Sequence, residues 1–148
     1  MRKIYYNSIM ARLFLWVKGK NTATFFGFIC TKHKSASPLS ASVINHEAIH
    51  VEQYKEVTAA ALLMAVVLSP LFGWMAWPYI AALLLFYLIY FVEAGISWVF
   101  HAICRSKNAV DISYRNSMFE MEAYAHENNI GYIPDRKPFY WLHYIGKV

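Results

Sequence analysis

Two long apolar runs dominate the pattern of hydrophobic and polar positions along the chain. The first extends from Val57 to Trp77, 21 residues without a charged side chain. At ~1.5 Å per residue, a helix of this length crosses a ~30 Å hydrocarbon layer, and membrane helices tolerate breakers such as Pro70 and Gly73. The second run, from Tyr79 to Ala102, contains a single charge, Glu93. The pattern therefore predicts two membrane spans joined by a short turn.

Helical periodicity begins well before the first span, near residue 42, with Ser40 or Ser42 as the predicted N-cap. Because no break signal lies between residue 42 and the start of the first span, we expect one continuous helix over 42–77, followed by the second span over 79–104. The two spans would form a helical hairpin. With its turn centred near Ala76, residue 101 would return to the level of about residue 51, so His101 would face the turn that carries His50.

Shorter elements flank the two spans. Residues 9–34 hold two apolar-aromatic runs separated by KGKNT, which predicts a short N-terminal β-hairpin, although the first run could be an amphipathic helix. A further helix is predicted over 113–130. The aromatic, basic tail at 131–148 is expected to lie against lipid headgroups. A chain of 148 residues organised in this way is predicted to be a single, mainly α-helical membrane domain.

Composition and charge favour a membrane protein. Charged residues make up 16% of the chain, against ~25% in ordinary soluble domains. Eight of the 14 Lys and Arg residues lie within 1–57 and six within 105–148, so the positive-inside rule predicts that both termini of this two-span chain lie in the cytoplasm. These basic residues are scattered singly among aromatics, which favours a membrane surface over nucleic acid. The alternative is a soluble core, for which so short a chain has little room.

The segment NHEAIH contains a His-Glu-x-x-His pattern formed by His46, Glu47 and His50. On a helix, positions i and i+4 share one face, so the two imidazoles can bind one metal ion. Glu47 could act as general base on a water whose pKa a bound zinc ion lowers. The alternative is a helix of interfacial polar residues without a metal.

A catalytic zinc ion needs a third protein ligand. None follows directly in VEQYKE, but the segment FEMEAYAHE offers four candidates: Glu120, Glu122, His126 and Glu127. In the second span, Glu93, Ser97 and His101 form a polar stripe at i, i+4 and i+8. An ionisable residue within a span indicates a functional site, and the alternative for Glu93 is an interhelical hydrogen bond to Thr58.

The segments NHEAIH and YRNSMFEMEAY, separated by a membrane hairpin, resemble the integral-membrane gluzincin metallopeptidases. This group includes the CAAX prenyl protease and the bacterial heat-shock membrane protease. Across residues 42–127, the resemblance implies a Zn²⁺ cofactor with His46, His50 and Glu120 as ligands and Glu47 as catalytic base. The family's Asp that supports the site is replaced by Tyr124, so this support must come from another residue: Glu122, Tyr124 or Glu127.

These features predict a membrane-embedded zinc metallopeptidase, a hydrolase that cleaves a peptide bond at the cytoplasmic membrane surface by a metal-activated water. Its expected partners are the lipid bilayer and a membrane-associated peptide or protein substrate, without nucleic acid, and it could form a homo- or hetero-oligomer. Candidates for stabilising the oxyanion are His101, Tyr124 and His126. One alternative is a membrane di-iron oxidase or hydroxylase that uses the Glu47-x-x-His50 pair, although a second such pair is missing. The other is a non-catalytic membrane subunit stabilised by a metal.

Overall fold

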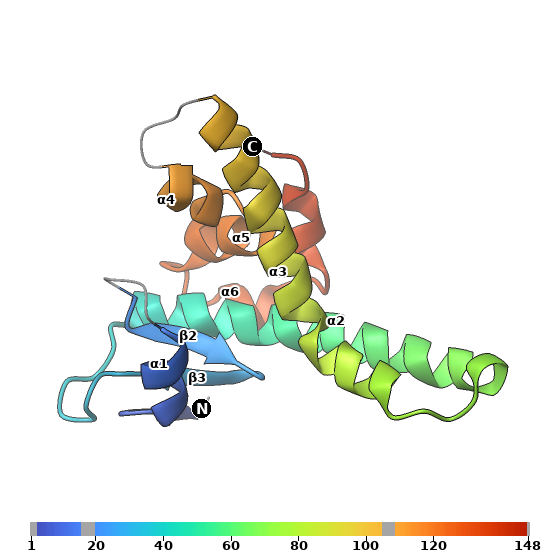
Figure 1. Ribbon diagram of the computed structural model, residues 1–148. Coiled ribbons are helices and arrows are strands. Elements are labelled where there is room, and N and C mark those ends of the chain that lie inside the picture. Colours follow the sequence, from blue (N-terminus) through green and yellow to red (C-terminus); the bar gives the residue numbers. More distant parts are fainter. Residues whose placement is uncertain (1–2, 16–19, 105–108, 148) are drawn as a thin grey trace. The chain divides into compact units, whose positions relative to one another are not determined.

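The computed structural model of the chain describes residues 3–15, 20–104 and 109–147, and it is mainly helical with one small sheet (Figure 1). The chain forms two compact units, residues 1–52 with 123–137, and residues 53–122 with 138–148. The elements in chain order are β1 (Ile4–Tyr5), α1 (Ile9–Phe14), β2 (Thr22–Phe25), β3 (Phe28–Thr31), α2 (Ala41–Phe72), α3 (Trp77–Ile103), α4 (Ala109–Arg115), α5 (Met118–His126), α6 (Tyr132–Asp135) and the 3₁₀ helix η1 (Tyr140–Tyr144).

The first unit contains a three-stranded sheet of order β1-β3-β2, in which β1 is parallel and β2 antiparallel to β3. The β2–β3 turn consists of Phe26 and Gly27, both with positive φ, as tight hairpin turns require. The predicted pairing of the two apolar runs is therefore wrong. The second run alone forms the hairpin, and the first forms α1, as the alternative had it. The turn expected at KGKNT lies partly outside the described residues.

Strand alternation gives this sheet two different faces. On one face Ile29 packs against Ala48 and Val51 of α2. On the other face lies α1, whose Ala11 is fully buried and whose Phe14 ring contacts the Phe25 ring at 5.7 Å. The start of α2 therefore rests on the sheet, on the face opposite α1.

Helix α2 runs without a break for 32 residues, as the sequence predicted, and includes Pro70. Ser40 caps it, because the Val43 N–H donates to the Ser40 hydroxyl at 3.3 Å. The helix ends at Phe72, earlier than expected, because Gly73 adopts a positive φ of 81°. Helix α3 then begins with Pro78 in its first turn. Both α2 and α3 are long and apolar enough to cross a membrane.

In the second unit, α3 does not return along α2 in the register that a closed hairpin requires. The Tyr54 ring contacts the Phe86 ring at 5.8 Å, whereas a turn centred near residue 76 would bring residue 98 to that level. Helix α5 contacts both partners here, since Phe119 packs on Phe86 at 4.7 Å and accepts a hydrogen bond from Gln53 at its carbonyl. Helix α5 therefore packs against both α2 and α3 at this level. The register from which His101 was placed opposite the His50 turn is therefore wrong.

The C-terminal aromatic tail is divided between the units, since residues up to Lys137 belong to the first and those from Pro138 to the second, where Trp141 is part of the core. Trp141 is 6% exposed, packs on Phe119 at 4.9 Å, and donates from its indole nitrogen to Glu56 at 3.0 Å. The expectation that the whole tail lies against lipid headgroups is thus wrong at Trp141. The predicted 113–130 helix is also divided, into α4 and α5, by a break before Met118.

Glu93 fixes the start of α5. Its carboxylate accepts the Met118 N–H at 2.8 Å, which is one of the amide groups that a helix N-terminus leaves without an intrahelical partner. The alternative considered for Glu93, a hydrogen bond to Thr58, is not formed, and the Thr58 hydroxyl has no hydrogen-bond partner among the described residues. The single charge of the second apolar run therefore anchors the helix that follows it.

A Glu93→Leu variant should unfold more easily than the wild type. It leaves the buried Met118 N–H without an acceptor, which costs ~1–3 kcal/mol. Thermal unfolding in detergent, followed by circular dichroism, measures the loss. Glu93→Gln keeps an acceptor oxygen and should restore most of the stability, and Ile96→Ala, at a position 68% exposed, is a control on the same helix. Wild-type stability in Glu93→Leu would contradict the anchoring role.

Candidate metal centre

His46 and His50 form a pair on consecutive turns of α2. Their Nε2 atoms lie 3.2 Å apart, and both residues are buried. The i, i+4 spacing puts both side chains on one face of the helix. The predicted pair is therefore formed within the first unit, with its two ring nitrogens directed at the same point.

A carboxylate orients the first of these histidines. The Nδ1 atom of His46 lies 3.0 Å from a carboxylate oxygen of Glu127. A neutral imidazole that donates from Nδ1 keeps its lone pair on Nε2, where it can bind a metal. Of the three residues considered for supporting the site, Glu127 makes this hydrogen bond. Tyr124 instead packs its ring against His46 at 4.7 Å.

Glu120 is held in the first turn of α5, in the second unit. Its N–H donates to the Ser117 hydroxyl at 3.3 Å, as in the Ser-x-x-Glu capping box. Its carboxylate accepts a hydrogen bond from the Tyr90 hydroxyl at 3.1 Å, and the residue is 1% exposed. A buried carboxylate in this position is costly unless it is bonded or binds a cation.

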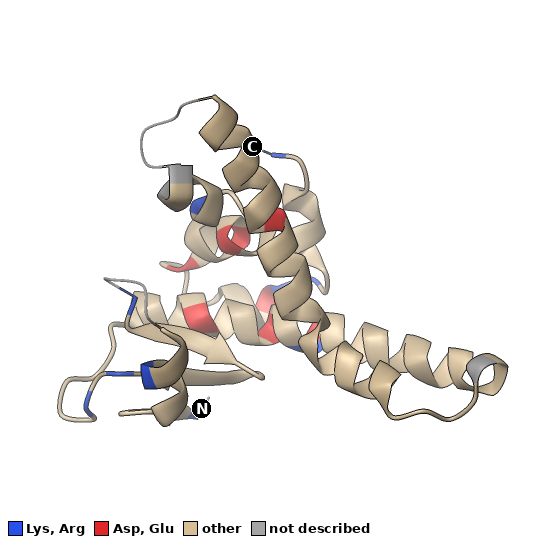
Figure 2. Cartoon of the chain, viewed as in Figure 1, with Lys and Arg blue, Asp and Glu red and all other residues tan. Residues whose placement is uncertain are grey.

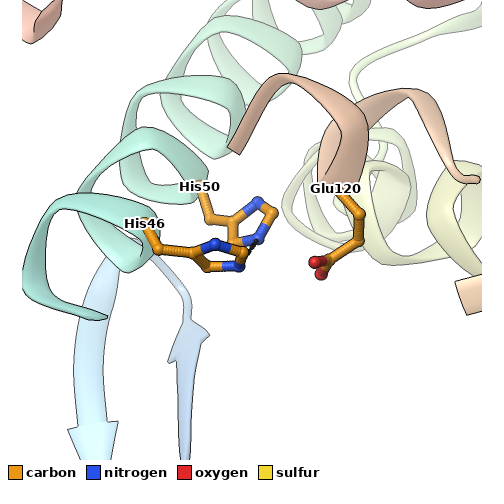
Figure 3. Close-up of side chains that lie close together, drawn as sticks. All are labelled: His46, His50 and Glu120. Carbon is orange, nitrogen blue, oxygen red and sulfur yellow. Dashed lines mark hydrogen bonds between the residues drawn. The ribbon is translucent and has the colours of Figure 1, made fainter. Parts of the chain in front are cut away.

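His46, His50 and Glu120 together form a buried group that could hold a metal ion. Their ligand atoms all lie within 4.8 Å of one another, and Figure 3 shows the three side chains. Two imidazole nitrogens and one carboxylate oxygen are a donor set that zinc accepts in catalytic sites, with a fourth position left open. The group contains Glu120 and not Glu122.

Glu122 has a different role, in the second unit. It is fully buried and accepts a hydrogen bond from Gln53 of α2 at 3.0 Å, while Gln53 also donates to the Phe119 carbonyl. Burial raises the pKa of the nearby Tyr144 phenol, and Tyr140 and Glu122 raise it further, so this phenol is neutral at physiological pH. Glu122 thus joins α5 to α2 near the metal ligands.

A second polar contact joins the same two helices in the first unit. The Asn45 side-chain amide donates to three carbonyl groups at the end of α5 and just beyond it, at 2.9, 3.1 and 3.0 Å, from His126, Glu127 and Asn129. Two of these carbonyls, those of His126 and Asn129, also accept the backbone N–H groups of Asn129 and Tyr132, so the Asn45 amide adds to the closure of the helix C-terminus. Along α2, residues that contact α5 therefore lie both before and after the two histidines.

Glu47 lies between the two histidines in sequence and is bonded to the sheet. The Thr24 hydroxyl of β2 lies 3.0 Å from both the carboxylate and the carbonyl oxygen of Glu47, and both residues are buried. The carboxylate is not one of the grouped ligand atoms. Strand β2 thus positions the Glu47 carboxylate within the first unit, which also contains the histidine pair. Thr24 and Tyr90 carry no motif, and sequence reasoning missed both.

The remaining residues that the sequence analysis named as candidates for the site make other contacts. The His126 ring stacks on Tyr132 at 3.8 Å, in the first unit. Glu93, Ser97 and His101 share α3, and one polar atom of each is buried without a hydrogen-bond partner among the described residues. Of the three oxyanion candidates, Tyr124 is the one whose ring contacts the ring of a candidate ligand directly, that of His46.

Removing the Glu127 carboxylate should weaken metal binding without removing a ligand. Loss of a partner that orients a ligand histidine typically lowers metal affinity ~10–100-fold. We expect this drop in Glu127→Ala, measured by competition with a fluorescent zinc chelator. Asp135→Ala removes an exposed carboxylate in the same unit and should leave the affinity unchanged. An unchanged affinity in Glu127→Ala would contradict the orienting role.

Comparison with known proteins adds no family assignment, because no protein-family profile, curated protein or solved structure matches this chain significantly.

Proposed function

We propose that the protein is an integral-membrane zinc-dependent metallopeptidase that hydrolyses a peptide bond at the cytoplasmic surface of the membrane. The observation that carries the proposal is the buried His46, His50 and Glu120 group, with Glu47 next to the first histidine. The donor set fits zinc in number and kind, and Glu127 already orients one donor. The resemblance to the membrane gluzincins agrees with this assignment.

Glu47 supplies the proton transfer in this mechanism. A divalent ion bound by the three residues would act as a Lewis acid on the peptide carbonyl and on water. The Glu47 carboxylate accepts a proton from the water whose oxygen attacks the carbonyl carbon. It then donates that proton to the amine nitrogen as the C–N bond breaks, so one water is added across the bond. Thr24 holds the carboxylate in place.

The position of strand β2 at the edge of the sheet favours a peptide as the substrate. Among the described residues β2 pairs with β3 alone, so its other edge offers backbone groups to an extended chain. The same strand carries Thr24, the partner of Glu47. A peptide added to this edge would therefore lie beside the helix that carries the proton acceptor.

Exposure of the two long helices supports a membrane location. Within their most apolar 18-residue windows, 28% of α2 and 11% of α3 is buried, whereas the core helix of a soluble protein is mostly buried. The distribution of Lys and Arg then favours cytoplasmic termini. A site at the start of α2 would accordingly suit a substrate that is in or on the membrane.

Metal analysis tests the cofactor. We expect one zinc ion per chain in protein purified in detergent without added metal, measured by inductively coupled plasma mass spectrometry. His46→Ala with His50→Ala, which removes both imidazoles, should contain none. Two iron atoms per chain with visible absorption would contradict the proposal and favour a di-iron oxidase.

Isotope labelling tests the reaction on a mixed pool of membrane proteins, so that no single substrate has to be chosen. Proteoliposomes are incubated with solubilised membrane proteins in H₂¹⁸O, and new C-termini are sought by mass spectrometry. We expect peptides that carry one ¹⁸O atom, and their loss after chelation and recovery with zinc. Protein that holds zinc but generates no labelled C-termini from this pool would favour the non-catalytic alternative.

A further inference from the structure

The sheet face that carries α1 is apolar and exposed. Pairing of Phe25 with Phe28 and of Tyr5 with Cys30 puts these four side chains on the face opposite α2. The Tyr5 and Phe28 rings contact each other edge to face at 5.6 Å, and they are 37% and 50% exposed. In a sheet with one face in water, the outer positions are usually polar. The aromatic residues at these outer positions indicate that this face does not contact water.

Helix α1 extends the same apolar surface. Its buried residue, Ala11, is small, while Ile9, Leu13 and Phe14 are 74%, 56% and 64% exposed. These side chains and the rings of Tyr5 and Phe28 constitute what we term the sheet–α1 face. Such a cluster on a small unit marks an interaction surface.

Positive charge surrounds the sheet–α1 face. Residues 1–46 contain seven Lys and Arg and no Asp or Glu, and in Figure 2 the charged residues described on the sheet and α1 are all blue, that is, basic. The Lys3 ammonium lies 5.1 Å from the centre of the Tyr5 ring. Arg12 projects from α1, where it bonds to Asn7, and Lys32 reaches the Leu15 carbonyl just past the end of α1. The face therefore combines apolar side chains with a basic rim.

We propose that the sheet–α1 face docks onto an anionic lipid surface. Aromatic and aliphatic side chains enter the boundary between headgroups and acyl chains, while Lys and Arg reach the phosphate groups. Nucleic acid fits less well, because Ile9 and Leu13 neither stack on bases nor bond to phosphate. The inference goes beyond the proposed peptidase and is independent of any metal. It requires only that the chain is membrane-bound.

A nitroxide at Leu13 tests the docking. The label is attached to Leu13→Cys in the full chain with Cys104→Ser, since Cys30 is buried. The protein is reconstituted in vesicles of phosphatidylcholine alone or with an equal amount of phosphatidylglycerol. Electron paramagnetic resonance power saturation then compares collision with oxygen, which partitions into lipid, and with a water-soluble nickel chelate. We expect nickel accessibility to fall several-fold in the anionic vesicles.

Two reference labels make the result decisive. Leu84→Cys on α3, at a residue 48% exposed, reports a position inside the bilayer, and Ser35→Cys in an exposed loop reports water. Leu13 should resemble Leu84 more than Ser35 in anionic vesicles, and ~1 M salt should weaken this protection because charges are screened beyond ~3 Å. Nickel accessibility of Leu13 equal to that of Ser35, with Leu84 protected, would overturn this inference alone.

Two other outcomes also count against it. If the Leu84 label is as accessible to nickel as the Ser35 label, the membrane location itself fails and the docking fails with it. If Leu13 is protected equally in both vesicle types and at both salt concentrations, the basic rim does not select anionic lipid. Replacing Lys3, Arg12 and Lys32 by Gln should reduce protection in anionic vesicles in the same way as salt.

Discussion

A Glu47→Gln variant should keep its zinc and lose peptide hydrolysis by a factor of ~10²–10⁴, the usual contribution of a positioned general base. The amide has the shape of the carboxylate and can still accept the Thr24 hydroxyl hydrogen, so the fold and the histidine pair should be unaffected. It cannot accept a proton at neutral pH. The ¹⁸O-labelling rate and the zinc content of the same preparation measure the two properties together.

Glu52→Gln is the matched control, because it makes the same chemical change on the same helix, two residues after His50. It should retain both zinc and activity. Full activity in zinc-loaded Glu47→Gln would eliminate the proposed mechanism. Loss of zinc in Glu47→Gln would instead make Glu47 a metal ligand, against the grouping of the three donors.

A Glu120→Ala variant should lose most of its metal, with an affinity at least ~100-fold below that of the wild type. Catalytic zinc sites use three protein ligands, and this change leaves two. Equilibrium competition with a chelator measures the affinity. Glu122→Gln retains an acceptor for Gln53 and should bind zinc as the wild type does. The comparison shows which of the two carboxylates, two residues apart in the sequence, is the metal ligand.

The reverse result would identify a different ligand. Zinc retained in Glu120→Ala and lost in Glu122→Gln would transfer the third position to Glu122, and α5 would have to turn relative to its present contacts. Thermal unfolding of the metal-free proteins controls for folding. Glu120→Ala without metal should melt close to the metal-free wild type, apart from the loss of the hydrogen bond from Tyr90.

The local features of this protein could be predicted because they depend on short spacings. The i, i+4 histidine pair, the Ser40 cap and the unbroken α2 follow from residues within a few turns of one another. The β-hairpin was misplaced because two apolar runs competed, and the Phe-Gly turn inside the second run was the better turn. Strand propensities do not reliably distinguish between two possible strand pairings when both runs are short and apolar.

Features that depend on distant packing could not be predicted in the same way. At the level where α3 meets α2, Phe86 contacts both Tyr54 and Phe119, and Phe119 lies far along the chain from the other two. The choice of Glu127 over Glu122 and Tyr124 likewise depends on the direction in which the end of α5 approaches His46. No spacing in the sequence encodes either fact.

The start of α5 has a thermodynamic consequence. Its first amide groups are satisfied by Glu93 and by Ser117, both of which are bonded independently of any metal. The Glu120 side chain is thus not needed to close its own helix, and its carboxylate is available to bind an ion. A ligand-bearing helix that is already terminated loses little conformational entropy when an ion arrives, so affinity is not spent on folding this helix. Chelation should therefore yield a folded protein that rebinds zinc rapidly, unlike a zinc finger, which unfolds when its ion is removed.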